Sequence, residues 1–499
     1  MGIKASLAKL AAATIVPKIY AEHKNAEKVQ QRIFHHLIKK AKGTRFGNEH
    51  EFSGIHSHRE FVHAVPVKDY EDLKHYMEMI AEGKPGVLWP GQPLYFCKSS
   101  GTTSGTKYIP LTKESIAAQI AAARNALLHY VHETGRANFF DKKMIFLQGS
   151  PELEKYGEIP VGRLSGIVYH HVPAYLNKNR MPSYAVNCIE DWEQKVEAIA
   201  KETLAQDMSL ISGIPPWTIM YFEKLLELSK KSTVAEVFPS FELFVYGGVN
   251  YEPYRSKIEA LIGFAIPSIE TYPASEGFLA YQDSITSNGL LLNLNAGIFY
   301  EFIKADEYGK ESAKRLTISE VELHVNYAVI LNTNAGLWAY SIGDTVKFVS
   351  KNPYRIIVTG RIKHFISAFG EHVIAEEVEY ALLQAAQKTN APFTEFTVAP
   401  QVNPDAGLPF HEWFIEFTTP PDDLQQLAQL TDELMQQKNS YYRDLREGNI
   451  LQQLQITSLP AGTFVTYMRQ TGKLGGQNKV ARLTNNRQIA DALTNLAQQ

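Results

Sequence analysis

The feature that most restricts the fold is an alternation of helical and strand patterns between residues 192 and 271. Amphipathic helices are predicted at 192–204, 217–228 and 251–262, and short apolar strands at 210–212, 241–246 and 267–271. Such an alternation is typical of a mostly parallel sheet that is covered by helices. Ligands bind at the carboxyl ends of the strands in sheets of this kind. The sequence therefore predicts an α/β protein with a site where these strands end.

The flanking regions complete the predicted fold. Helices are expected at 1–42, 70–81, 112–133, 374–389 and 422–437, and a loop at 43–54. Strands are expected at 144–147, 393–399 and 412–418, with one more after them, and antiparallel strands at 290–292, 299–303, 321–331, 337–340 and 346–349. We therefore expect a large multi-layer N-terminal domain with mostly parallel sheets and an antiparallel β portion, followed by a small α+β C-terminal domain.

Charge and cysteine content limit the class of protein. The 50 Lys and Arg against 53 Asp and Glu give a net charge of −3, whereas proteins that bind nucleic acid or anionic membranes usually have a basic surplus. Only two cysteines occur, which favours a reducing compartment, and no apolar run approaches the length of a membrane span. We expect a cytoplasmic monomer without a nucleic-acid partner or stable membrane association.

A glycine-rich stretch that ends in lysine is the strongest candidate for a binding site. Glycine lets the backbone approach a ligand, while hydroxyl groups, free N–H groups and a lysine charge together favour an anion such as polyphosphate. The candidate ligands are Ser99, Ser100, Gly101, Thr102, Thr103, Ser104, Gly105 and Lys107. The alternative is a flexible linker, but a linker would not usually be this short, lie between apolar strands and end in lysine.

Two common phosphate loops do not match this stretch. A Walker A loop that started at Gly101 would have Thr106 in place of its second glycine and Tyr108 in place of its Mg²⁺-binding hydroxyl. No G-x-G-x-x-G sequence follows a predicted strand, so a Rossmann pyrophosphate site is not indicated either.

The stretch resembles the phosphate-binding motif of acyl-adenylate-forming enzymes, which include acyl-CoA synthetases, peptide-synthetase adenylation domains and firefly luciferase. Together with V-P-V-K-D-Y-E-D-L at 65–73 and G-K-P-G at 83–86, it is similar to the auxin-responsive acyl acid amido synthetases, in a bacterial-type version. Further matches follow in the family's order: Y-x-x-S-E at 272–276, Y-S-I-G-D at 340–344 and a hinge motif that begins at 360.

The resemblance implies a role for each matched residue. Tyr272 would pack on adenine, Ser275 would contact the α-phosphate, and Glu276 would ligate Mg²⁺. Asp344 would accept both ribose hydroxyls, which suits one ionised carboxylate; alone, however, it would be interpreted as an ordinary turn residue. Arg361 would contact ribose or phosphate, and Lys363 falls on the hinge position. The resemblance thus implies a hinge between an N-terminal domain, 1–360, and a small C-terminal lid domain, 361–499. The backbone at Gly247 and Gly248 would let an adenine ring lie flat against the chain.

Two sequence questions stay open at this point. The superfamily places a C-terminal lysine in the active site, and either Lys473 or Lys479 fits; Lys479 is favoured because the amido-synthetase tail matches there, and Arg482 would reinforce its charge. The stretch 149–176, rich in Gly, Pro and Tyr, fits an acyl-substrate pocket and a packed surface loop equally well.

The resemblance implies that ATP and Mg²⁺ serve to activate a carboxylic acid as an acyl-adenylate, and that an amine, expected to be an amino acid, then accepts the acyl group. One alternative is an acyl-CoA ligase, which uses the same first step. The other is a catalytically silent nucleotide- or acyl-binding protein, although such a protein would have no use for the carboxylates of Glu276 and Asp344.

Overall fold

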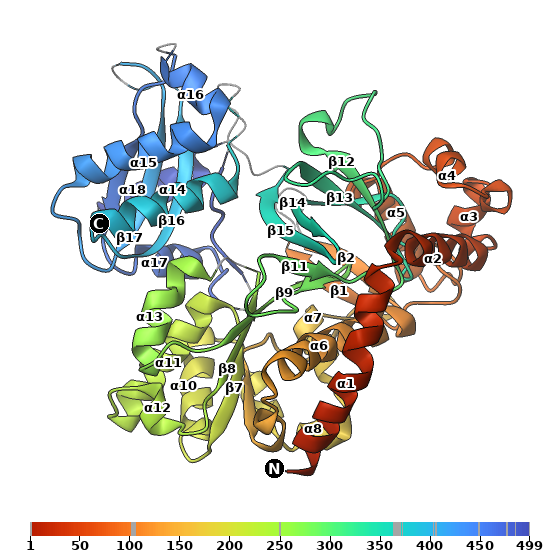
Figure 1. Cartoon of the computed structure of the whole chain (residues 1–499), viewed down its shortest axis with the longest axis horizontal. Coiled ribbons are helices and arrows are strands. Elements are labelled where there is room, and N and C mark those ends of the chain that lie inside the picture. Colours follow the sequence, from red (N-terminus) through yellow and green to blue (C-terminus); the bar gives the residue numbers. More distant parts are fainter. Residues whose placement is uncertain are drawn as a thin grey trace. The chain divides into compact units, whose positions relative to one another are not determined.

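The computed structural model describes residues 2–100, 106–248, 251–362, 371, 373–402, 404, 407–447, 450–475, 478–484 and 486–498. The chain divides into two compact units (Figure 1). The first comprises Met1–Val249, Lys257–Ile342 and Val346–Ile357, and the second comprises Asn250–Ser256, Gly343–Thr345 and Val358–Gln499. The sequence-based division at residue 360 stays a prediction.

Among the described residues, one eleven-stranded sheet contains most of the strands of the first unit, in the order β12-β13-β14-β15-β11-β10-β9-β8-β7-β3-β6. Its strands are β3 (Lys143–Phe146), β6 (Arg180–Met181), β7 (Met208–Ser212), β8 (Leu243–Gly247), β9 (Ser268–Ala274), β10 (Gly277–Tyr281), β11 (Leu290–Leu292), β12 (Ile298–Lys304), β13 (Asn326–Thr333), β14 (Tyr340–Lys351) and β15 (Tyr354–Arg361). Strands β6, β3, β7, β8 and β9 pair in parallel, and the pairs β9–β10, β10–β11, β11–β15 and β12–β13 are antiparallel. The predicted α/β class is confirmed, with both portions in a single sheet.

The antiparallel portion differs from its prediction at the Y-S-I-G-D motif. We expected this motif between two strands, but it lies within the continuous strand β14, and residues 337–339 are outside any strand. The following strand β15 was not predicted at all. Gly343 has φ +80°, a conformation that only glycine adopts easily, and this lets the strand continue through the motif.

A second, four-stranded sheet has the order β2-β1-β5-β4. Its strands are β1 (Tyr95–Ser100), β2 (Thr106–Leu111), β4 (Glu154–Tyr156) and β5 (Ile159–Gly162). The strands on either side of the glycine-rich stretch therefore pair outside the main sheet, whereas Glu276 follows β9 of the main sheet. Strand β5 pairs in parallel with β1, so part of the stretch 149–176 is regular structure packed beside β1. That pairing supports a packing role, and the acyl-pocket interpretation stays a prediction.

Helices cover the strands of the first unit. They are α1 (Ile3–His23), α2 (Ala26–Ala41), α3 (Arg45–Glu49), α4 (His58–Ala64), α5 (Tyr70–Ala81), α6 (Lys113–Thr134), α7 (Leu164–Tyr169), α8 (Ala174–Asn177), α9 (Tyr184–Asn187), α10 (Trp192–Thr203), α11 (Pro215–Ser229), α12 (Val234–Val237) and α13 (Glu252–Ile262), whose first turn belongs to the second unit. Helices α1 and α6 share a buried core with β3, β7, β8 and β9. Figure 1 shows α10 and α11 on the other side of β7 and β8.

Capping residues explain which helix boundaries were predicted well. The side chain of Asp69 accepts hydrogen bonds from the first turn of α5, and Thr112 caps α6 by accepting from Ser115 N–H. The single helix expected at 1–42 was wrong, because the backbone of Asn25 leaves the helical region and separates α1 from α2. The expected loop at 43–54 was also wrong, because Thr44 caps the short helix α3.

The second unit has its own core. Its three-stranded sheet has the order β16-β17-β18, formed by β16 (Phe393–Gln401), β17 (Phe410–Phe417) and β18 (Gln455–Leu459). Its helices are α14 (Ala375–Lys388), α15 (Leu424–Lys438), α16 (Ser440–Glu447), α17 (Thr463–Gln470) and α18 (Gln488–Ala497). Val378 and Leu382 of α14, Leu427 of α15, and Phe396 and Trp413 of the sheet are all buried together. This arrangement confirms the predicted small α+β C-terminal fold.

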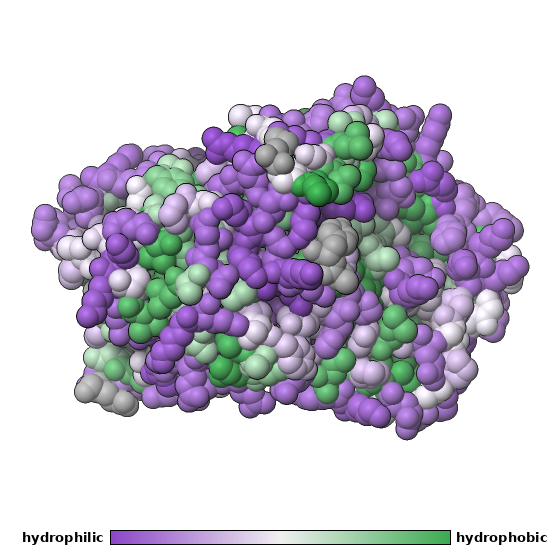
Figure 2. All heavy atoms as spheres, turned by 90° about the horizontal axis from the view of Figure 1, so that it is seen from below, coloured by the Kyte–Doolittle hydropathy of each residue, from purple (hydrophilic) through white to green (hydrophobic). Residues whose placement is uncertain are grey.

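In the part of the chain that the structure describes, no helix is both long enough and apolar enough to cross a bilayer. Figure 2 shows one face of the molecule, on which hydrophobic residues form separate groups among hydrophilic ones. Scattered apolar side chains of this kind are normal on protein surfaces.

Acidic pH is expected to destabilise the first unit through His23. This side chain is 4% exposed, and its Nδ1 accepts a 3.1 Å hydrogen bond from Tyr354 N–H. Burial lowers the pKa of His23 from the ordinary 6.5 to about 4, and the nearby groups His129 and Arg355 act in the same direction. The charge of Asp283 opposes this shift. Below pH 6.5 the unfolded chain therefore binds a proton that the folded chain does not, so stability is full above pH 6.5 and falls toward pH 4, by up to about 3 kcal/mol.

Denaturant unfolding at pH 7.5 and pH 5.0 measures this effect. The difference between the two pH values should shrink in His23→Gln and stay unchanged in His35→Gln, since His35 is exposed. An undiminished difference in His23→Gln would show that other groups cause the acid sensitivity.

Candidate functional site

The β1–β2 hairpin fixes the position of Lys107. In its antiparallel register, Ser99 pairs with Lys107 and Ser100 with Thr106. The predicted ligands Gly101, Thr102, Thr103, Ser104 and Gly105 lie outside the described residues, as do the side chains of Ser99 and Ser100. Lys107 is half-buried, with its ammonium 5.7 Å from the centre of the Tyr70 ring.

The other lysine of the hairpin belongs to the opposite face. Lys98 pairs with Tyr108, one position away from the Ser99–Lys107 pair, and side chains alternate between faces along a strand. Its ammonium is 3.0 Å from the carboxylate of Glu154. The hairpin therefore presents Lys98 and Lys107 on opposite faces, and Glu154 neutralises the charge of Lys98.

The turn between β9 and β10 carries Ser275 and Glu276, both half-buried. The Cys97 thiol of β1 donates a 3.1 Å hydrogen bond to the Ser275 hydroxyl oxygen. Burial raises the pKa of Cys97 to about 12, so this thiol stays protonated and remains the donor. The hydroxyl hydrogen of Ser275 is then available for an acceptor such as a phosphate oxygen. The structure thus brings the strand that leads into the glycine-rich stretch into contact with the Y-x-x-S-E motif.

Helix α6 holds the end of β9. The Gln119 side chain, itself buried, donates a 2.9 Å hydrogen bond to the carbonyl of Ala274, the residue before Ser275. A buried amide that bonds a backbone carbonyl fixes that carbonyl in place, because its loss would leave both groups without a partner. The turn that carries Glu276 is therefore anchored from a helix on one side and from β1 on the other.

Different structural features account for the two glycines at the end of β8. A Cβ on Gly247 would lie 2.4 Å from the carbonyl oxygen of Thr271 on β9, so close strand packing already requires glycine there. Gly248 has φ +83°, and a Cβ built on it would meet no atom within 4 Å. Open space beside bare backbone is what a flat ring needs. The geometry accordingly supports the adenine interpretation at Gly248 more than at Gly247, and Tyr272 follows directly after Thr271 on the paired strand.

In the second unit, the structure pairs Asp344 with Arg361. Arg361 Nε lies 2.7 Å from Asp344 Oδ1, with the two side chains 41% and 18% exposed. The Ile362 N–H donates to the carbonyl of Gly343 at 2.7 Å, which holds the ends of β14 and β15 together at this point. The two predicted nucleotide-binding residues thus form one group. The predicted hinge residue Lys363 lies outside the described residues.

The segment that contains Lys479 is anchored to β16. The Val398 N–H donates to the carbonyl of Arg482 at 2.9 Å, and the Thr484 N–H donates to the carbonyl of Val398 at 3.0 Å. Leu483, between them, is fully buried. The segment is therefore part of the folded unit, and α18 follows it.

Charged side chains surround Lys479. It is exposed, as Lys473 is, yet the protein atoms around it lower its pKa; Arg361 and Arg482 act in the same direction, and Asp344 opposes them. Arg482 was expected to reinforce the positive charge here, and its charge does act on Lys479. It also forms ion pairs with Glu379 and Glu395 and donates to the Tyr254 hydroxyl at 2.8 Å, so it anchors the segment as well.

Sequence reasoning missed Cys97 and Arg163. Arg163 precedes α7 and interacts electrostatically with Cys97, and partial burial lowers its pKa. No local motif marks either residue; only the β1–β5 pairing, which joins segments far apart in sequence, brings them together.

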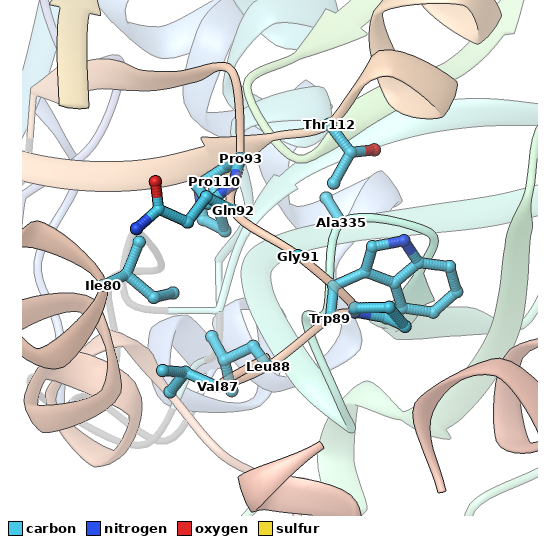
Figure 3. Close-up of a pocket in the computed structure, with 11 residues that line it drawn as sticks. Ile80, Val87, Leu88, Trp89, Gly91, Gln92, Pro93, Pro110, Thr112 and Ala335 are labelled. Atoms are coloured by element: carbon cyan, nitrogen blue, oxygen red, sulfur yellow. The ribbon is translucent and has the colours of Figure 1, made fainter. Parts of the chain in front are cut away.

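Figure 3 shows a cavity beside α5 that is lined by Ile80, Val87 and Leu88 together with Pro110. Its volume is about 10 Å³, which is room for one water at most, so it is no substrate site.

Models of one protein family cover most of the chain. The GH3 family N-terminal domain matches residues 16–183 and 175–266, the central domain matches 291–361, and the C-terminal domain matches 376–488. The chain belongs to the GH3 family.

Individual relatives of this GH3 chain agree with the match. The jasmonoyl–L-amino acid synthetase JAR6 of Nicotiana attenuata is 21% identical over 529 residues, which cover 91% of this chain and 90% of the relative. The solved structure of the GH3.15 acyl acid amido synthetase superposes with a TM-score of 0.80 at 14% identity, covering 98% of this chain and 96% of the other. A 2-hydroxyisobutyryl-CoA ligase structure in complex with 2-HIB-AMP gives a TM-score of 0.56 at 12% identity, covering 96% and 92%. The GH3 chain thus has the fold of both proteins.

The described residues of the GH3 chain are compatible with a Mg²⁺ ion that binds together with a nucleotide. Among the described residues, no group of three or more His, Cys, Asp or Glu side chains could hold a metal alone. Mg²⁺ usually takes one or two carboxylates together with substrate phosphates. Glu276, half-buried in the β9–β10 turn, would supply such a carboxylate.

Proposed function

We propose that this GH3 chain is an AMP-forming acyl acid amido synthetase. It activates a carboxylic acid with ATP to an acyl-adenylate and pyrophosphate, and then transfers the acyl group to the amine of an amino acid. The observation that carries the proposal is the Cys97–Ser275 contact, which joins the glycine-rich hairpin to the Y-x-x-S-E motif in a chain of this family. The proposal includes a division at residue 360 with a hinge at Lys363, and a cytoplasmic location.

The first step joins two negatively charged groups. A carboxylate oxygen attacks the α-phosphorus, and the bond to the leaving pyrophosphate breaks. Preorganised positive charge and donors lower the barrier, because they stabilise charge that builds up in the transition state. We assign Lys107 to the leaving phosphates, Ser275 to the α-phosphate, and Asp344 with Arg361 to the ribose. Mg²⁺ held by Glu276 would neutralise phosphate charge.

The second step needs only positioning of the amine. Its nitrogen, as the neutral amine, attacks the acyl carbon of the adenylate; AMP leaves with the oxygen that came from the acid, and the nitrogen loses a proton to solvent. The protein supplies orientation and charge and forms no covalent bond to the acyl group.

The main alternative is transfer of the acyl group to coenzyme A. The CoA ligase structure shows the same fold at 12% identity, whereas the jasmonoyl–L-amino acid synthetase is 21% identical over 91% of this chain. Full-length sequence similarity therefore favours an amino acid as the acceptor.

Pyrophosphate release tests the proposal. The purified chain is screened with ATP, Mg²⁺ and a library of carboxylic acids, and the active acids are then tested with each amino acid or with coenzyme A. We expect acid-dependent release and an amide product. Thioester formation without amide would favour the CoA ligase, and no release with any acid would favour a silent binding protein.

Glu276 and Asp344 are expected to give different kinetic defects. Asp344→Ala should weaken ATP binding by about tenfold or more, because charge-assisted hydrogen bonds to the ribose are lost. Glu276→Ala should chiefly raise the Mg²⁺ concentration needed for half-maximal rate. Titration of ATP at saturating Mg²⁺, and of Mg²⁺ at saturating ATP, separates the two effects. Identical defects in both variants would contradict the division of roles.

Lys479 is expected to act in the first step only. Lys479→Ala should slow adenylation by about a hundredfold, since it removes a charge near the site of Asp344, but should spare aminolysis of a supplied acyl-adenylate. Lys473→Ala is the matched control, and it should react at nearly the rate of the unaltered protein. If Lys473→Ala loses adenylation instead, Lys473 is the catalytic lysine. If both variants keep full activity, neither lysine acts in catalysis.

A further inference from the structure

The segment Val65–Tyr70 leads to the Lys107 side chain, and we call it the strap. We propose that Tyr70, at the end of the strap, is a positioning residue that fixes the orientation of Lys107 for the phosphates of ATP. The inference rests on the proposed function, because it needs Lys107 to act on a triphosphate. It extends that function to a residue in the V-P-V-K-D-Y sequence, which the proposed mechanism leaves without a role.

Tyr70 contacts the hairpin in two ways. Its hydroxyl oxygen accepts a 2.9 Å hydrogen bond from the N–H of Tyr108, the residue after Lys107. Its ring faces the Lys107 ammonium at 5.7 Å, within the range of a cation–π contact. Tyr70 is 4% exposed, so the packing around it leaves the ring little freedom. One side chain thus fixes both the backbone beside Lys107 and the position of its charge.

The strap is itself fixed at its middle to β14. Lys68 N–H donates to the carbonyl of Ala339 at 2.9 Å, and Ser341 N–H donates to the carbonyl of Lys68 at 2.9 Å. Lys68 therefore forms a parallel bridge with Tyr340, the first residue of the Y-S-I-G-D motif. The strap connects the start of this motif to the hairpin that bears Lys107.

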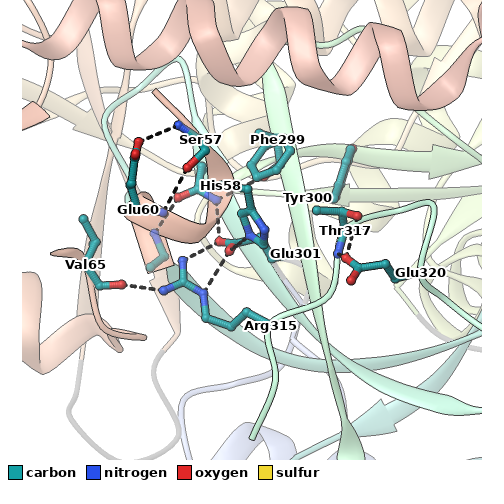
Figure 4. Close-up of polar contacts among 12 residues, drawn as sticks. Ser57, His58, Glu60, Val65, Phe299, Tyr300, Glu301, Arg315, Thr317 and Glu320 are labelled. Atoms are coloured by element: carbon teal, nitrogen blue, oxygen red, sulfur yellow. Dashed lines mark hydrogen bonds and ion pairs between the residues drawn. The ribbon is translucent and has the colours of Figure 1, made fainter. Parts of the chain in front are cut away.

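Both ends of the strap have further anchors. Asp69 caps α5, and its side chain accepts from the N–H groups of Glu71 and Asp72. At the other end, the Arg315 guanidinium donates to the carbonyl of Val65 (Figure 4). A short segment held at three points cannot move Tyr70 far, and a rigid Tyr70 can hold Lys107 before ATP arrives. Such preorganisation is what catalysis by positioned charge requires.

The test compares ATP with AMP. Lys107 is assigned to the two phosphates that AMP lacks, so loss of its orientation should weaken ATP binding and leave AMP binding unchanged. We expect Tyr70→Leu, which removes the ring and the hydroxyl, to weaken ATP binding roughly tenfold. Tyr70→Phe keeps the ring and should give a smaller loss. A purely structural role would weaken both nucleotides equally.

Tyr76→Phe is the matched control on the same helix. Tyr76 is buried like Tyr70, but its hydroxyl donates to Glu49 at 2.5 Å. This variant should keep the ratio of ATP to AMP affinity. If Tyr70→Leu does not fold, Tyr70→Phe alone decides the result through the same ratio.

The outcomes separate the two proposals. If the unaltered protein releases pyrophosphate with an acid, but both Tyr70 variants keep its ATP-to-AMP affinity ratio, only the positioning role of Tyr70 is overturned. If the unaltered protein releases no pyrophosphate with any acid and does not prefer ATP to AMP, the proposed function is overturned and the role of Tyr70 with it.

Discussion

Replacing Lys107 with alanine is expected to slow acid-dependent pyrophosphate release by about a hundredfold or more. One preorganised group directed at developing charge contributes on the order of 3 kcal/mol to a transition state of this kind. Lys107 fits that role because it follows the glycine-rich stretch, is half-buried, and faces the ring of Tyr70. The rate is measured at saturating acid, ATP and Mg²⁺, so that weaker binding of ATP does not hide the effect on the chemical step.

Lys98→Ala is the control within the same hairpin. It removes the same charge from the opposite face, where Glu154 neutralises it, so the rate should change little. Equal losses in the two variants would mean that the hairpin needs net positive charge or correct folding only. Full activity of Lys107→Ala would show that the glycine-rich stretch is a linker, and the function proposed from it would be wrong.

The largest expected effect on stability comes from Arg315→Ala. Glu301 of β12 is fully buried, and Arg315 contacts it with two hydrogen bonds, Nε to Oε1 at 2.9 Å and Nη2 to Oε2 at 2.6 Å (Figure 4). His58 and Asn332 contact the same carboxylate at 2.7 and 2.8 Å. Burial alone would raise the pKa of Glu301, but the charge of Arg315 and the hydrogen bonds from His58 and Arg315 lower it to about 2.

Without Arg315, a buried carboxylate loses its compensating charge. The free energy of unfolding should then fall by about 3–5 kcal/mol, measured by denaturant titration. Lys304→Ala serves as the comparison: Lys304 lies on the same strand, but its ion pair with Glu322 is at the surface, so its loss should change stability little. If the two variants lose equal stability, Glu301 is not held as a buried charge. Arg315→Ala also frees the carbonyl of Val65, so in a folded sample it should weaken ATP binding in the same sense as Tyr70→Leu.

Local signals explain what the sequence could predict. Helix α5 was expected at 70–81 and occurs at Tyr70–Ala81, because Asp69 and the apolar spacing both act within a few residues. The parallel strands followed from the alternation between 192 and 271, which needs no knowledge of distant partners. The motifs themselves are local, and this is why the family was predicted correctly.

Long-range pairing accounts for what the sequence did not predict. Strand β1 pairs with β5, whose residues follow about 65 positions later, and nothing near Tyr95 distinguishes that partner from the main sheet. The ion pairs of Arg482 involve Glu379 and Glu395, which are 103 and 87 residues away, so its anchoring role could not be predicted from nearby sequence. The sequence indicated Tyr70 only as part of a motif. Its contact with Tyr108 could not be predicted, because it arises from the packing of α5 against β2.

The most direct test of the proposed function follows an oxygen atom. The most active acid from the pyrophosphate screen is labelled with ¹⁸O in its carboxylate and incubated with the chain, ATP, Mg²⁺ and the preferred amino acid. Mass spectrometry should find one ¹⁸O in AMP for each amide formed and none in pyrophosphate, because the attacking carboxylate oxygen stays on the α-phosphate when the amine displaces AMP. Label in inorganic phosphate with ADP as the nucleotide product, or amide formation with unlabelled AMP, would contradict an acyl-adenylate intermediate.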